Sequence, residues 1–167
     1  MFGIAIPQLQ ADNALLKDRV FVDTLTQAYT REYLAQRSAL EMAQSRESGS
    51  SLYFVMFDLD KFKRINDELG HVDGDNALRR LSQVTKDIVR KADVFARFGG
   101  DEFVLLLPNI SEQNAMNLLE KVREGINAIV ISEVSLSSSF GVTLMQQSDT
   151  LETLIQRADR ALYASKE

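Results

Sequence analysis

The central segment of the sequence reads Arg97-Phe98-Gly99-Gly100-Asp101-Glu102-Phe103, and apolar runs flank it at residues 94–96 and 104–107. Two strand-like runs joined by a glycine pair predict a β-hairpin with a tight primed turn. Both central residues of such a turn have φ > 0, which glycine adopts without strain. Asp101 and Glu102 then stand at the start of the returning strand, where neighbouring side chains point to opposite faces. Taken alone, these acids are also typical of a solvated hairpin tip.

The composition limits the kinds of site that the chain can build. Its 167 residues, 45% of them hydrophobic, suffice for one domain with a substantial core. The net charge of −5 argues against non-specific nucleic-acid binding. Cysteine is absent and His71 is the single histidine, which excludes thiolate metal sites and argues against His-rich zinc sites and Ser-His-Asp triads. Metal chemistry must therefore rest on carboxylates, which suit hard ions such as Mg²⁺.

Hydrophobic periodicity predicts an α+β fold in which helices pack against one sheet. No apolar run reaches membrane-spanning length and no signal peptide is recognisable, so we expect no membrane contact from this segment. We expect residues 1–22 to be a linker or stalk, helical from about residue 8, and residues 23–167 to form one folded domain. The predicted elements are a helix at 30–45, a strand at 52–58, a helix at 61–69, a helix from about 75 to 91, the hairpin, a helix from 111, a strand at 134–144 with a short strand near 130, and a helix at 150–166.

The predicted strand at 52–58 ends in acidic residues, as the hairpin does. Alternation places Asp58 and Asp60 on one face. If this strand lies beside the hairpin, Asp58 and Asp101 or Glu102 converge at one sheet edge. Such carboxylates form a good Mg²⁺ site once substrate phosphates complete the coordination. The alternative, a set of solvated acidic loops, remains open at this point.

Several polar residues also have structural explanations. The segment 73–75 reads as a turn, and Asp75 suits the N-cap of the next helix. His71 reads as a hydrogen-bonding residue after a helix end, and Lys63 and Lys166 as surface charges. Asn66 has no evident structural reason for its position in a short helix.

Blocks along most of the chain resemble the GGDEF family of diguanylate cyclases, in order and at compatible spacing. Besides the central heptad they are Asp23-Thr-Leu-Thr26, Phe57-Asp-Leu-Asp-Lys-Phe-Lys63, Ile65-Asn-Asp67, Gly70-His71, Gly74-Asp75, Ser139-Phe-Gly-Val142 and Ala158-Asp-Arg-Ala-Leu-Tyr163. The resemblance runs from Asp23 to the end, so it implies that residues 23–167 are a GGDEF catalytic domain. It also implies a palm-like, mostly antiparallel sheet surrounded by helices, related to nucleotidyl cyclases. The implied activity condenses two GTP molecules into cyclic di-GMP and releases two pyrophosphates.

The resemblance assigns a metal site to the acidic residues. It implies that Asp58 and Asp101 bind Mg²⁺ or Mn²⁺, that Leu59 adds its backbone carbonyl, and that Asp101 is the candidate general base. Glu102 resembles a further catalytic residue, and which of the two acids is the base stays open.

The resemblance also assigns substrate contacts. It implies that Asn66 and Asp75 bind guanine. An amide can pair with guanine O6 or N3, and a carboxylate can accept the N1 and N2 hydrogens. The remaining implied substrate contacts are Phe62, Lys63, Gly99, Gly100 and Lys166. The resemblance also implies a catalytic role for Lys63. The Arg90-Lys91-Ala92-Asp93 pattern resembles the family's product-inhibition site, so Arg90 and Asp93 are expected to bind cyclic di-GMP. Without the resemblance, the same pattern reads as a solvated helix end.

The resemblance implies catalysis by a homodimer in the cytoplasm, under a sensory or receiver domain that precedes this one. The chain departs from the family at Gln27-Ala28 and Thr30, which we expect to alter a turn. It ends at Glu167, before a Gly-Arg-Asn whose arginine holds phosphate in some relatives, so we expect weaker GTP binding. The rival interpretations are a non-catalytic module that binds GTP or cyclic di-GMP, and another palm-type nucleotidyl transferase.

Overall fold

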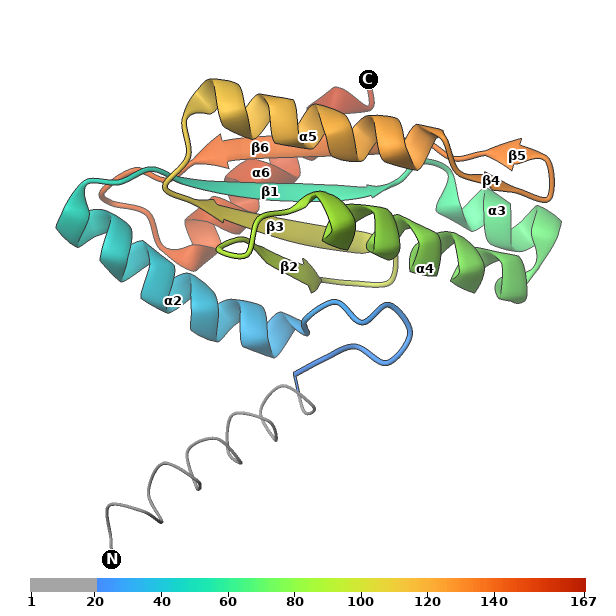
Figure 1. Ribbon diagram of the computed structural model, residues 1–167, viewed down its shortest axis with the longest axis horizontal. Coiled ribbons are helices and arrows are strands. Elements are labelled where there is room, and N and C mark those ends of the chain that lie inside the picture. Colours follow the sequence, from blue (N-terminus) through green and yellow to red (C-terminus); the bar gives the residue numbers. More distant parts are fainter. Residues whose placement is uncertain (1–20) are drawn as a thin grey trace, which may run out of the picture.

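A four-stranded antiparallel sheet forms the centre of the structure, a computed structural model that describes residues 21–167 (Figure 1). The strand order is β2-β3-β1-β6. The strands are β1 (Leu52–Leu59), β2 (Val94–Arg97), β3 (Glu102–Pro108) and β6 (Ser138–Leu144). All neighbours pair antiparallel, which confirms the predicted α+β, palm-like sheet.

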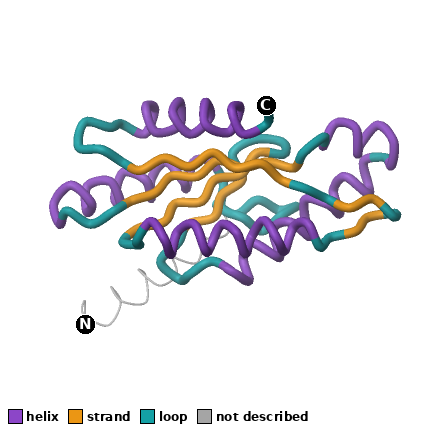
Figure 2. Tube along the Cα trace, turned by 90° about the horizontal axis from the view of Figure 1, so that it is seen from above, coloured by secondary structure: helices purple, strands orange, loops and turns teal. Residues whose placement is uncertain are grey.

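Helices cover both faces of this sheet, so the domain has three layers (Figure 2). On one face lie α2 (Arg31–Ser48) and α6 (Leu151–Ser165), and on the other α4 (His71–Ile88) and α5 (Glu112–Asn127). The short helix α3 (Phe62–Leu69) follows the end of β1, near a separate hairpin of β4 (Val130–Ile131) and β5 (Val134–Ser135). Helix α3 therefore begins at the edge of the sheet, directly after β1 ends.

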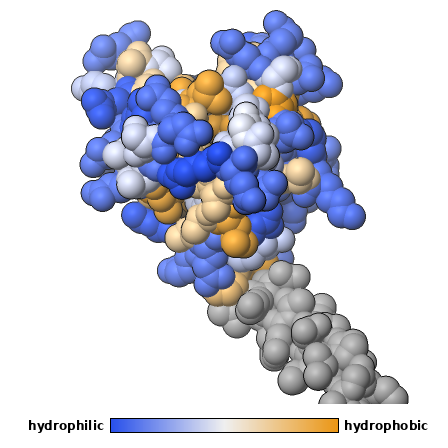
Figure 3. Space-filling view, turned by 90° about the vertical axis from the view of Figure 1, so that its left-hand side faces the viewer, coloured by the Kyte–Doolittle hydropathy of each residue, from blue (hydrophilic) through white to orange (hydrophobic). Residues whose placement is uncertain are grey.

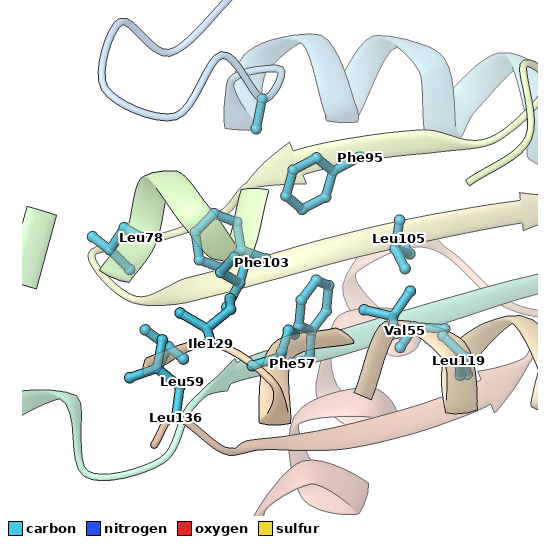
Figure 4. Close-up of a cluster of buried hydrophobic side chains, with 14 of the residues drawn as sticks. Val55, Phe57, Leu59, Leu78, Phe95, Phe103, Leu105, Leu119, Ile129 and Leu136 are labelled. Atoms are coloured by element: carbon cyan, nitrogen blue, oxygen red, sulfur yellow. The ribbon is translucent and has the colours of Figure 1, made fainter. Parts of the chain in front are cut away.

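Strand β1 contributes to the core on both sides, as its continuous apolar run predicts. Every residue of β1 is buried, and alternate side chains enter different clusters. On the α4 and α5 side, the ring of Phe57 lies 6.1 Å from that of Phe95 and 5.7 Å from that of Phe103 (Figure 4). On the α2 and α6 side, Phe54 is fully buried. Asp58, near the end of this strand, is itself buried.

Three of the helices begin at the hydroxyl residues where the sequence predicts a start. The side chains of Thr30, Ser111 and Thr150 each accept a hydrogen bond from a backbone N–H in the first turn of α2, α5 and α6. This satisfies one N–H group that has no partner within the helix.

The hairpin loop differs from the predicted primed turn. Neither Gly99 nor Gly100 has a positive φ. Strand pairing ends at Arg97 and Phe103, and a wider loop follows in which the N–H groups of Phe98 and Gly99 both donate to Glu102 O. The primed-turn prediction is therefore wrong, and Asp101 lies in the loop before β3.

The region after α3 also differs from the prediction. Helix α4 begins directly at His71, because Gly70 adopts φ 91° and reverses the chain in one residue. Gly74 and Asp75 lie inside α4, so the predicted turn at 73–75 and the N-cap role of Asp75 are wrong. The helix also ends at Ile88 and not near residue 91.

The predicted strand at 134–144 is two strands. Residues 134–135 pair with β4, the expected short strand near 130, and β6 begins at Ser138. The turn between β4 and β5 contains two left-handed residues, Ser132 and Glu133. This turn reverses the chain direction before the chain enters β6 of the main sheet.

The predicted N-terminal helix lies outside the described residues except for its last two. Val22 forms a bridge with Tyr29, and Thr30 N donates to Phe21 O. Among the helices of residues 21–167, none is both long and apolar enough to cross a lipid bilayer. In the view of Figure 3, the surface of the described residues is mainly hydrophilic, and the apolar residues form small separate groups.

Candidate active site

Two carboxylates face each other at the end of β1. Asp58 of β1 is paired with Glu102 of β3, and directly opposed residues of antiparallel strands share a face. Asp101 precedes Glu102 and is close enough to act electrostatically on both. The sheet register therefore brings together the acids from the two segments that the sequence singled out.

This corner disfavours negative charge when no cation is present. Burial raises the pKa of the Asp58 carboxyl; Lys166 opposes the shift, and the charges of Asp101 and Asp60 add to it. Burial likewise raises the pKa of Glu102, and Asp101 and Asp58 act in the same direction. A positive ion at this corner would relieve both effects.

Asp58 has one oxygen paired and one unpaired. Its Oδ2 accepts from Lys166 Nζ at 2.6 Å, whereas the buried Oδ1 has no hydrogen-bond partner among the described residues. A buried, unpaired carboxylate oxygen fits a divalent cation. Within residues 21–167, however, no three acidic or histidine side chains are arranged to hold one. Carboxylates of this corner would therefore hold such an ion only together with further oxygens, from a backbone carbonyl such as that of Leu59 and from the substrate.

The chain leaves β1 through a strained residue. Lys61 adopts φ 57° at the N-cap of α3 and makes no side-chain capping bond. A left-handed conformation is uncommon for lysine and costs on the order of 1 kcal/mol. The first N–H groups of α3 thus lack a cap, Phe62 packs on the core, and Lys63 is exposed beside them. Free N–H groups with a nearby lysine suit a phosphate.

The packing of α3 on α4 brings Asn66 close to the segment of α4 that contains Asp75, and both residues were expected to contact guanine. The side-chain amide of Asn66 lies against Gly74, the residue before Asp75. Asn66 and Asp75 are both partly exposed. Within residues 21–167, no hydrogen bond of the Asn66 side chain is present, so the amide is available to a ligand.

Arg97 fastens the hairpin loop to the N-terminal segment, a role that sequence reasoning missed. Its guanidinium donates to Asp23 Oδ2 at 3.1 Å, to Gly99 O at 3.2 Å and to Gly100 O at 2.7 Å. Asp23 also accepts from the N–H and hydroxyl of Thr26, and these bonds overcome the effect of burial and lower its pKa. The sequence signal for this contact is the Asp23-Thr-Leu-Thr26 segment, which the family resemblance includes without giving it a role.

The chain is similar to known proteins along most of its length. Residues 20–167 match the family model described as "Diguanylate cyclase, GGDEF domain". The chain belongs to the GGDEF family. It is 36% identical over 154 residues to diguanylate cyclase DgcP of Pseudomonas aeruginosa, covering 90% of this chain and 23% of DgcP. The chain thus spans about a quarter of that relative.

Solved GGDEF structures share the fold. Diguanylate cyclase SiaD of Pseudomonas aeruginosa, solved with its activator SiaC, has a TM-score of 0.91 and 33% identity, and the match covers 99% of this chain and 65% of SiaD. The GGDEF domain of DgcB from Caulobacter crescentus, solved in complex with c-di-GMP, has a TM-score of 0.82 and 26% identity, and the match covers 88% of each chain.

In this GGDEF domain, Arg90 and Asp93 lie away from the carboxylate corner. The Arg90 guanidinium donates to Asp93 and to Pro108 O. Pro108 pairs with Leu52 and lies at the end of β3 opposite to Glu102. Asp93 has a fully buried side chain and also accepts from Arg90 N at 2.7 Å. The pair is therefore closed on itself, beside a pocket of about 560 Å³ that Arg90, Arg37 and Asn109 help to line.

Another pocket of the GGDEF domain holds none of the predicted site residues. It measures about 340 Å³ between α3 and β5 and is lined by Arg64, Ile65 and Val134 among others. The carboxylate corner and the α3–α4 face, and not this pocket, bring the predicted groups together.

Proposed function

We propose that this GGDEF domain condenses two GTP molecules into cyclic di-GMP with release of two pyrophosphates. The observation that carries the proposal is the register that sets Asp58 opposite Glu102, with a buried Asp58 oxygen that has no hydrogen-bond partner among residues 21–167. Membership of the family supports the same activity. The relatives are much longer than this chain, so the activity is proposed for the domain itself.

Asp58, Asp101 and the Leu59 carbonyl would hold Mg²⁺ or Mn²⁺. When bound there, the ion supplies charge neutralisation for the phosphates and increases the acidity of the attacking hydroxyl. Lys166, already hydrogen-bonded to Asp58, would move to a phosphate oxygen when the carboxylates are neutralised. Burial raises the pKa of Asp58 and of Glu102, and the neighbouring acids add to the shift. A positive ion beside them would relieve this effect, which supports the assignment.

The reaction needs a base, for which the chain offers two acids. The 3′-hydroxyl of one GTP attacks the α-phosphorus of the other, the new phosphodiester bond forms, and pyrophosphate leaves. Asp101, in the loop before β3, is the candidate that takes the hydroxyl proton. Glu102 is the alternative, because it lies opposite Asp58 and burial raises its pKa, which makes its carboxylate a stronger base than a solvated one.

The neighbouring groups fit the rest of GTP. Lys63 and the uncapped N–H groups that begin with Phe62 suit the phosphates. Gly99 and Gly100 have ordinary φ values, and a β-carbon on either would meet no crowding atom. Their missing side chains are therefore not required by the chain's own conformation, which supports close approach of a nucleotide to the loop.

The proposed enzyme is a homodimer. One chain supplies one Asn66 and Asp75 pair for one guanine, so two GTP molecules require two copies that face each other. We also propose a cytoplasmic site of action, where GTP is available, and control by a sensory or receiver domain or by a protein activator, as SiaD has in SiaC.

We propose that cyclic di-GMP binds at Arg90 and Asp93 and restrains turnover. A related GGDEF domain has been solved with c-di-GMP, and the pocket beside Arg90 offers space for a ligand. The buried Asp93 would first have to exchange its bond to Arg90 for one to the ligand. Product affinity that is the same in Arg90→Ala as in the wild type would contradict this site.

Pyrophosphate release tests the enzyme against the alternative, a non-catalytic GTP- or cyclic di-GMP-binding module. With GTP and Mg²⁺, the proposed homodimer releases pyrophosphate at a rate per molecule that rises with protein concentration and then levels off. A binding module would retain GTP and release none. A rate per molecule independent of concentration would contradict the requirement for two domains.

A further inference from the structure

The side chain of Asn66 of α3 lies against Gly74 of α4. A β-carbon built on Gly74 would lie within the contact radius of Asn66 Oδ1 and 2.9 Å from its Cγ. The three atoms that such a carbon would meet first all belong to Asn66. The Asn66 amide therefore occupies the space that any larger residue at position 74 would fill.

The backbone of α4 gives no other reason for a glycine at this position. Gly74 does not have a positive φ, it lies inside the helix, and its N–H donates to Gly70 O as an ordinary helical residue does. Glycine is a poor residue inside a helix, where alanine is more favourable. Its use here is explained by the neighbouring side chain.

We propose that Gly74 is a positioning residue for guanine recognition, because its missing side chain leaves the Asn66 amide beside Asp75. This inference rests on the proposed function, in which Asn66 and Asp75 contact the guanine of GTP. The amide has no hydrogen bond within residues 21–167 to hold its orientation, and it lies against Gly74.

A methyl group at position 74 would turn the amide without disturbing the core. The atom displaced first is the end of a flexible side chain, which moves at little cost, and alanine improves the helix. Gly74→Ala should thus fold at least as well as the wild type and lose guanine recognition. A purely structural glycine would show the opposite result.

The test measures binding of guanosine and adenosine 5′-(α,β-methylene)triphosphates, with Mg²⁺, beside thermal unfolding. Gly74→Ala should bind the guanosine probe about tenfold more weakly, the equivalent of one lost hydrogen bond, and the adenosine probe as before. Its unfolding midpoint should be unchanged or higher. In an Asn66→Ala background, Gly74→Ala should have no further effect, because no amide remains to be displaced.

Gly125→Ala is the matched control. Gly125 lies in α5, and a β-carbon there would meet Val84 Cγ1 at 2.5 Å, an atom of the apolar interior. Gly125→Ala should lower the unfolding midpoint and leave both nucleotide affinities unchanged.

Each outcome of this test either supports or overturns the role of Gly74. Equal affinity of Gly74→Ala and the wild type for the guanosine probe overturns the inference, as does an equal loss with and without Asn66. A wild type that does not bind the guanosine probe overturns both this inference and the proposed substrate. If the predicted binding pattern holds while GTP yields no cyclic di-GMP, the proposed catalysis fails and the role of Gly74 stands.

Discussion

The Nζ of Lys166 lies 2.6 Å from Oδ2 of Asp58, so the residue that ends α6 closes over the end of β1. Burial disfavours the charged lysine, but the bond to Asp58 outweighs this and raises the pKa of Lys166. The ammonium partly offsets a group of carboxylates that would otherwise repel one another. The domain thus carries a balancing charge at the corner where we propose that a divalent ion binds.

Asp58→Asn should separate stability from activity. The neutral amide removes a buried charge whose ionisation the fold disfavours, so the metal-free variant should be as stable as the wild type or up to about 1 kcal/mol more stable. Cyclic di-GMP formation should fall by about 100-fold or more. Urea unfolding and a product assay measure the two effects, and Asp87→Asn, at an exposed site bonded to Gln83, should change neither.

The same variant has a pH signature. A raised folded-state pKa means that Asp58 contributes stability below its ordinary pKa, about 3.9, and loses it as the pH rises through the raised value. The metal-free wild type should therefore gain stability relative to Asp58→Asn as the pH falls from 7 toward 4. A difference that does not depend on pH would contradict the burial of this carboxyl.

Arg97→Lys should loosen the hairpin loop. A lysine ammonium cannot reach Asp23 and both glycine carbonyls at once, as the planar guanidinium does. We expect turnover to fall about tenfold and stability by about 1 kcal/mol. Arg123→Lys, which alters a surface ion pair with Glu120, is the control. Unchanged turnover in Arg97→Lys would refute a role for this contact in holding the loop.

Asp149→Asn should weaken the domain in a pH-dependent way. The buried Asp149 accepts from both terminal nitrogens of Arg157, which outweighs burial and holds its pKa well below the usual range. Its stabilisation is full above the ordinary aspartate pKa and is lost as the pH falls through the lowered value. Chemical unfolding should show a deficit of about 3 kcal/mol at pH 7 that shrinks below about pH 4. A deficit that is constant down to pH 3 would rule out this explanation.

Gly141→Ala should destabilise the domain, unlike Gly74→Ala. A β-carbon on Gly141 would collide with backbone atoms of α6 and lie 2.8 Å from Leu162 Cα. Backbone cannot move aside as a side-chain amide can, so we expect a loss of about 2 kcal/mol in urea unfolding. Gly100→Ala, where a β-carbon meets nothing within 4 Å, should unfold like the wild type.

The sequence predicts the elements better than it predicts the contacts between them. The apolar run at 52–57 indicates a strand buried on both faces, because that property depends on the residues of the strand alone. The Asp23 contact of Arg97 spans 74 residues and leaves no local pattern. Gly74 reads as a turn residue because its partner, Asn66, belongs to another helix.

Glycine positions show the same limit. The glycine pair at 99–100 suggests positive φ values, yet neither residue has one, because the loop between β2 and β3 is wider than a two-residue turn. Gln27, where the chain departs from the family, adopts φ 62° and donates its N–H to Asp23 O. The turn therefore carries some strain, since the surrounding bonds outweigh the residue's preference.

The most direct measurement is the mass spectrum of the nucleotides that the protein forms from GTP and Mg²⁺ at high protein concentration. The account predicts cyclic di-GMP from the wild type and none from Asp101→Ala, with both proteins folded. A wild type that leaves GTP unconverted, or an Asp101→Ala variant that forms as much product as the wild type, would contradict it.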